Sequence, residues 1–75
     1  MNRETPDIHF AGYVMACGYT LDGCRRDGKR CLFRFEASEE VWNELLASWA
    51  NRTGTVVAFE YVEKIRALKS LVHAV

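Results

Sequence analysis

The stretch Tyr19–Glu36, YTLDGCRRDGKRCLFRFE, decides the fold, because two strand-like runs flank a charged turn in its middle. Asp27-Gly28 at its centre is the strongest turn signal in the chain. Such a dipeptide between runs rich in apolar residues is typical of a β-hairpin. The stretch therefore predicts two antiparallel strands, with helical segments before and after them.

The turn residues leave two registers of this hairpin open. A two-residue turn at Asp27-Gly28 sets Cys24 opposite Cys31, and apolar and charged side chains then share a face. A three-residue loop at Arg26–Gly28 needs only glycine in the left-handed conformation, which costs glycine little. We favour the three-residue loop because it gathers the apolar side chains on one face.

The favoured register defines an apolar face that packs against the helices. Leu21 then lies opposite Phe33 and Tyr19 opposite Phe35, and a slip of one residue would expose all four. The side chains expected to point inward are Cys17, Tyr19, Leu21, Cys31, Phe33 and Phe35. The side chains expected to point outward are Thr20, Asp22, Cys24, Arg30, Leu32 and Arg34.

Length and composition describe a single domain over residues 1–75. The chain is 49% hydrophobic and 12% aromatic, which argues against disorder. Its formal net charge is zero, which argues against a general coat for nucleic acid but allows a local basic patch. No apolar run is as long as a membrane span, and the first residues lack a signal-peptide core. We therefore expect a cytoplasmic protein.

The three cysteines, Cys17, Cys24 and Cys31, are spaced seven residues apart, which matches no metal motif. A zinc site with His9 as a fourth ligand is the alternative, but such cysteines are more often small buried apolar residues. We expect neither a metal nor a cofactor. The odd count without a signal peptide predicts reduced thiols, and the favoured register predicts no Cys24–Cys31 disulfide.

Three helices are predicted around the hairpin. The first follows Thr5 as N-cap and Pro6 as first helical residue, and ends at Gly18. The second runs from Ser38, its N-cap, to about Asn51. The third runs from about Ala58 to Val72. Its apolar stripe consists of Val62, Ile65, Leu68 and Val72, with Tyr61 beside them.

The first two helices carry large apolar surfaces. The first is apolar almost all round, which indicates burial on several sides or a partner, and its Gly12 suggests close packing. The second has an apolar face made of Trp42, Leu45, Leu46 and Trp49. Its two tryptophans are more often core residues than residues that stack on bases. We predict a homodimer through one of these helices.

These elements predict an α+β fold: an N-terminal helix, a β-hairpin, then two helices packed on one face of the sheet. The short β-prone run Thr55–Val57 is a candidate third strand at the edge of the hairpin. Otherwise it leads directly into the last helix.

Three stretches, DIHFAGYVMACGYTL, RRDGKRCLFRFE and YVEKIRALKSLV, resemble a family of short uncharacterised domains in bacteria and their phages, domain of unknown function 5659. The shared pattern is an apolar helix ending in glycine and an aromatic residue, a hairpin ending in F-x-F-E, and a helix closing with a leucine–lysine pair. The matching residues are Ala11, Gly18, Tyr19, Leu21, Phe33, Phe35, Glu36, Leu68 and Lys69. The chain departs from the pattern at Ala58, where the family has a capping aspartate. The resemblance implies the fold and a bacterial or phage source, but no activity.

Half of the ten basic residues lie on the hairpin, at Arg25, Arg26, Lys29, Arg30 and Arg34. Leu32 stands between arginines on the predicted outward face, a composition favoured at protein interfaces. We predict from it a non-catalytic protein-binding module that binds, and in one version inhibits, a host protein. The resemblance adds that the chain is encoded by a phage or mobile element. The alternatives are a basic β-ribbon that tracks nucleic-acid phosphates and a merely solvated sheet face.

Catalysis has one candidate residue. Cys24 lies on the first strand of the hairpin, next to Arg25 and Arg26. The positive charges of these arginines would lower the pKa of its thiol. No base is positioned by the sequence to activate it, so we do not expect an enzyme.

Overall fold

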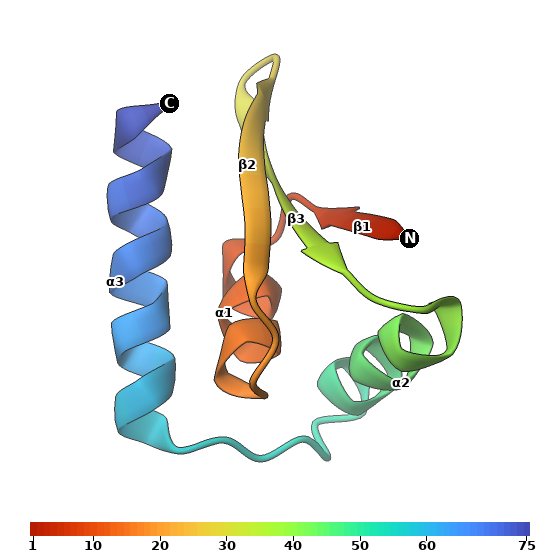
Figure 1. Ribbon diagram of the computed structural model, residues 1–75. Coiled ribbons are helices and arrows are strands. Elements are labelled where there is room, and N and C mark those ends of the chain that lie inside the picture. The colour runs from red at the N-terminus through yellow and green to blue at the C-terminus, as the bar shows by residue number, and fades with distance from the viewer.

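The predicted hairpin forms the centre of the fold (Figure 1). In a computed structural model that describes all 75 residues, β2 (Leu21–Asp27) and β3 (Arg30–Glu36) pair antiparallel. A third strand, β1 (Asn2–Thr5), pairs antiparallel with the other edge of β3, so the strand order is β1-β3-β2. The helices are α1 (Ile8–Ala16), α2 (Glu39–Ala50) and α3 (Ala58–Ala74). The predicted α+β fold is confirmed.

The third strand is not the one considered from the sequence. Thr55–Val57 has no strand structure and connects α2 to α3. The free edge of β3 is occupied instead by β1, whose Thr5 lies opposite Phe33 and is buried. Thr5 precedes Pro6, and a residue before proline favours extended backbone, which suits the end of a strand.

Both registers considered for the hairpin are wrong. The strands close on Asp27 opposite Arg30, with Gly28 and Lys29 as the two turn residues. Gly28 has a φ of 64°, whereas Asp27 and Lys29 keep negative φ. A type II′ turn needs positive φ only at its first central residue, so glycine occupies that position and the turn moves one residue along the chain.

A β-bulge brings the apolar residues of β2 to one face. Leu21 lies opposite Phe35 and Cys24 opposite Phe33, although Leu21 and Cys24 are three positions apart in the chain. Strict alternation would put them on opposite faces, and the register shift between Leu21 and Gly23 removes this conflict. Phe33 and Phe35 are buried as predicted. Cys24 packs against the core, so its predicted outward direction is wrong.

The caps of α1 explain where the helix begins and ends. The Asp7 side chain accepts hydrogen bonds from the backbone N–H groups of His9 and Phe10, so Asp7 is the N-cap in place of the predicted Thr5. Gly18 ends the helix as predicted, with a φ of 103°. The N–H of Gly18 reaches the carbonyl of Met15 and that of Tyr19 reaches Val14, which together form a Schellman motif.

The apolar surface of α1 is covered within the chain. The sheet, α2 and α3 surround this helix, and Phe10, Ala11, Tyr13 and Val14 are all buried. The first helix therefore presents no large apolar surface to a partner, and the homodimer stays a prediction. Cys17, expected to face inward, lies exposed at the end of the helix.

The other two helices bury fewer residues than the sequence pattern suggests. Ser38 caps α2 as predicted, and its hydroxyl accepts a hydrogen bond from Val41 N–H. Trp42 and Leu45 are buried, but Leu46 is 41% exposed. In α3 only Leu68 is fully buried, and Val62 is 46% exposed although the predicted stripe included it.

Gly12 lets α1 approach α3 closely, as its place in the apolar helix suggested. A Cβ atom at Gly12 would lie 2.5 Å from Cδ1 of Ile65. We expect Gly12→Ala to destabilise the protein by about 1–2 kcal/mol, because overpacking outweighs the gain in helix propensity. Ile65→Val deletes the clashing methyl group. In that background Gly12→Ala should be neutral or stabilising by urea denaturation, and an equal loss in both backgrounds would contradict this packing.

Candidate functional site

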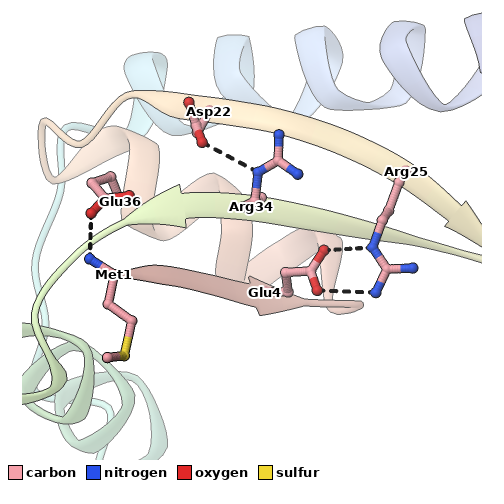
Figure 2. Close-up of polar contacts among 6 residues, drawn as sticks. All are labelled: Met1, Glu4, Asp22, Arg25, Arg34 and Glu36. Atoms are coloured by element: carbon pink, nitrogen blue, oxygen red, sulfur yellow. Dashed lines mark hydrogen bonds and ion pairs between the residues drawn. The ribbon is translucent and has the colours of Figure 1, made fainter.

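All three helices contribute side chains to the core on one face of the sheet, and the opposite face, here called the outer face, carries mostly charged groups. Figure 2 shows how these groups lie across the three strands. The residues of the outer face are Asn2, Glu4, Asp22, Gly23, Arg25, Asp27, Arg30, Leu32, Arg34 and Glu36, with the amino group of Met1 beside Glu36.

A bidentate ion pair spans the sheet from one edge strand to the other. Arg25 Nε donates to Glu4 Oε2 at 2.8 Å, and Arg25 Nη2 donates to Glu4 Oε1 at 3.1 Å. Arg25 lies opposite Leu32 and Glu4 opposite Arg34, so the pair crosses β3 between these two residues (Figure 2). Leu32 is only 7% exposed although it lies on the outer face.

A second ion pair joins the central strand to β2 at the bulge. Arg34 Nε donates to Asp22 Oδ2 at 3.2 Å (Figure 2). A Cβ atom at Gly23 would lie 2.8 Å from Arg34 Nη2. The guanidinium group therefore extends over Gly23, and the bulge places Asp22 within its reach.

Two further pairs lie at the ends of the outer face. The amino group of Met1 pairs with the carboxylate of Glu36 at one end (Figure 2). Beside the turn, Arg30 Nη2 lies 3.7 Å from Asp27 Oδ2. Each arginine of this face thus has a carboxylate partner, and the face is a set of neutralised pairs instead of a basic patch.

The six residues predicted as the partner-binding site do not share one surface. Arg25, Leu32 and Arg34 lie together on the outer face, and Lys29 and Arg30 lie at the exposed turn. The last, Arg26, lies opposite the buried Cys31, on the face that packs against the helices.

Arg26 contacts the end of α3. Its Nη2 lies 3.3 Å from the carbonyl oxygens of both Val72 and Val75. The last carbonyl groups of a helix lack partners within the helix, and a basic side chain satisfies them. Arg26 therefore has a structural role in tethering the end of α3 to the hairpin.

The acidic partner that most shapes the outer face, Glu4, was missed from the sequence. Residues 2–5 carry no strong strand pattern, and the first helix was expected to begin directly after them. The only local signal was Thr5 before Pro6, which favours extended backbone. Without β1, neither Glu4 nor the amino group of Met1 would lie near the hairpin.

The Glu4–Arg25 pair predicts a specific pH dependence. The hydrogen bond from Arg25 lowers the pKa of Glu4 from its ordinary value of 4.5. A lowered folded-state pKa stabilises the protein above pH 4.5, and this contribution is lost as the pH falls through the lowered pKa. An NMR titration of Glu4 should show its pKa returning towards 4.5 in Arg25→Gln or in high salt. An unchanged pKa in Arg25→Gln would contradict the pairing.

The cysteines occupy three different environments. Burial, with a further contribution from Cys31, raises the pKa of the Cys24 thiol above its ordinary value of 9.0, and this outweighs the nearby Arg26. A lowered pKa at Cys24 is therefore wrong. Iodoacetamide at pH 8 should alkylate the exposed Cys17 at least about tenfold faster than Cys24, as peptide mass spectrometry would show. Equal labelling of the two thiols would contradict this order.

No cluster of three or more histidine, cysteine, aspartate or glutamate side chains is arranged to hold a metal ion. None of the helices combines the length and apolar composition that crossing a bilayer requires.

Comparisons with protein-family models, with curated proteins and with solved structures found no match for this chain. The resemblance to domain of unknown function 5659 therefore stays a prediction.

Proposed function

We propose that this chain is a small non-catalytic protein-binding module whose contact surface is the outer face of the sheet. The observation that carries this proposal is the set of arginine–carboxylate pairs on a sheet face that no helix covers. Arginine is enriched at protein interfaces, and alternating charges recognise a partner with the complementary pattern. Leu32, which lies between these arginines, is too buried to be the centre of a contact, so Arg25 and Arg34 take that place.

Nucleic-acid binding by the hairpin is the second candidate, and the exposed turn with Lys29 and Arg30 favours it. Binding to phosphates depends on basic groups that are free to replace counterions. Among the basic residues of the hairpin only Lys29 has no carboxylate or carbonyl partner in the chain. Because the other basic side chains already have partners within the chain, a protein is the better-supported binding partner.

The finer parts of the proposal come from the sequence. A cytoplasmic location agrees with the reduced state expected for the cysteines. Encoding by a phage or mobile element follows from the resemblance alone. Inhibition of a host protein is one form of the protein binding that the composition of the hairpin predicts. Self-association, if it occurs, would use the exposed residues of α2 or the outer face, because α1 is already covered.

A charge-swapped variant tests the proposed surface. Glu4→Arg combined with Arg25→Glu keeps the ion pair across the sheet but reverses the pattern that a partner meets. We expect pull-downs from bacterial lysate to retain protein with the natural chain after nuclease treatment. The same protein should be lost with the swapped chain, although urea denaturation should give both chains similar stability.

Two outcomes would count against the proposal in different ways. Capture that nuclease abolishes, and that Lys29→Ala and added salt weaken, would favour nucleic acid. Equal capture of protein by the natural and swapped chains would remove the outer face as the contact surface. A swapped chain that unfolds is replaced by Arg34→Gln, which removes one charge from the same face.

A further inference from the structure

A pocket in the helical layer carries a second inference, independent of the outer face. It lies where α1, α2 and the start of α3 meet the connection between α2 and α3, which passes the end of α1 (Figure 1). Its volume of about 370 Å³ lies in the range of sites for small organic ligands. Its walls are mainly aromatic, and Tyr13, Trp49 and Tyr61 supply them.

The three hydroxyl groups that line the pocket already donate hydrogen bonds within the chain. Ser48 Oγ donates to the carbonyl of Leu45 at 3.0 Å, so Tyr13 donates its own proton to Ser48 Oγ at 2.8 Å. The hydroxyl of Tyr61 donates to the carbonyl of His9 at 3.3 Å. These bonds hold the tyrosine rings in place and leave none of the three hydroxyl protons for a ligand.

The uncommitted donors belong to Arg52 and Trp49. Arg52 lines the pocket and forms no ion pair in the chain. The indole N–H of Trp49 likewise has no hydrogen-bond partner. The Trp49 ring lies 5.3 Å from the Tyr13 ring between centroids, at an interplanar angle of 36°. A cation beside an aromatic wall is a combination that suits a planar anion with an apolar ring.

The backbone at Arg52 has an unfavourable conformation, which costs the fold stability. Arg52 has a φ of 59°, the only positive φ outside glycine. Its N–H bonds to the carbonyl of Trp49 and that of Thr53 to Ser48, which makes Arg52 the left-handed residue of a Schellman motif. Glycine is preferred at this position because it has no Cβ atom. The chain places here a long cation whose charge has no partner of its own.

We propose that this pocket binds a small organic acid made of an aromatic ring and a carboxylate. The ring packs against Trp49 and Tyr61, and the carboxylate pairs with the guanidinium group of Arg52. Two sources supply this chemistry: a free aromatic acid, or the C-terminal residue of a peptide that ends in an aromatic side chain. Neither ligand would contact the outer face. A negative result for this pocket would therefore leave the proposed function unaffected, and a negative result for the outer face would leave the pocket unaffected.

The charge of the ligand provides the first test. We expect 2-naphthylacetate to shift the indole N–H signal of Trp49 in NMR titrations and to bind at least about tenfold tighter than 2-naphthylacetamide, its neutral counterpart. Equal affinity for the acid and the amide, or no response from Trp49 at millimolar concentration, would overturn the proposal. A peptide ending in a free C-terminal phenylalanine, compared with its amidated form, distinguishes the two sources by whether it binds tighter than 2-naphthylacetate.

Arg52→Gly gives the decisive variant, because stability and binding should change in opposite directions. Removing the strained side chain should raise the melting temperature, by about 4 °C, while the preference for acid over amide disappears. Arg52→Gln keeps the side-chain length without the charge and should also lose the preference. Retention of the preference in either variant would overturn the assignment of Arg52.

Discussion

Phe33→Ala should lower the free energy of unfolding by about 3–5 kcal/mol, most of the stability expected of a domain this small. Phe33 is 1% exposed and lies on the central strand, opposite Thr5 on one side and Cys24 on the other. Its side chain therefore lies between the sheet and the helical layer. The cavity left by Phe33→Ala cannot be filled by a neighbouring element without moving the sheet.

Urea denaturation followed by circular dichroism measures this loss. Arg34→Ala is the matched control, because Arg34 is the next residue of the same strand but points to the outer face. Losing its exposed pair with Asp22 should cost about 1 kcal/mol or less. A Phe33→Ala protein as stable as the Arg34→Ala protein would mean that the inner face of the sheet is not the core.

Trp42→Ala should cost about 3–5 kcal/mol and should release α2 from the rest of the fold. The Trp42 ring meets Phe10 of α1 edge-on at a centroid distance of 5.3 Å and lies 6.0 Å from Phe35 of the sheet. One side chain thus joins α2 to both other layers. Edge-to-face aromatic pairs contribute beyond the buried area alone.

Hydrogen exchange locates the effect of Trp42→Ala. The amides of α2 should lose protection before those of α1, because α1 keeps its contacts with the sheet and α3. Leu46→Ala is the control, since Leu46 belongs to the same predicted apolar face but is 41% exposed, and it should change stability by about 0.5 kcal/mol or less. Equal effects of the two substitutions would contradict the observed orientation of α2.

The predicted partner-binding residues show what residue types alone can and cannot predict about function. Five basic residues and a leucine on one hairpin suggested a shared basic contact surface. The structure assigns Arg26 to the end of α3, buries Leu32, and pairs Arg25 with Glu4, a residue more than twenty positions away along the chain. Such pairing depends on which strand lies beside which, and composition contains no information about it.

Local chemistry determined much of this protein. Ser38 begins α2 and Gly18 ends α1, because a side-chain cap and a left-handed glycine act through neighbouring residues only. The alternation of Phe33 and Phe35 with Arg34 and Glu36 placed both rings in the core because strand side chains alternate between faces.

Tertiary structure decided the register, the third strand and the surface. The hairpin register includes a bulge at Asp22, which puts Leu21 and Cys24 on the same face of the sheet. A prediction based on strict alternation of side chains does not allow for such a bulge. Residues 2–5 form a strand because β3 has a free edge to satisfy their backbone groups, and without that edge their sequence has little β preference. Local signals thus set the start of α2 and the end of α1, whereas contacts between distant residues set which elements pair and which charges meet.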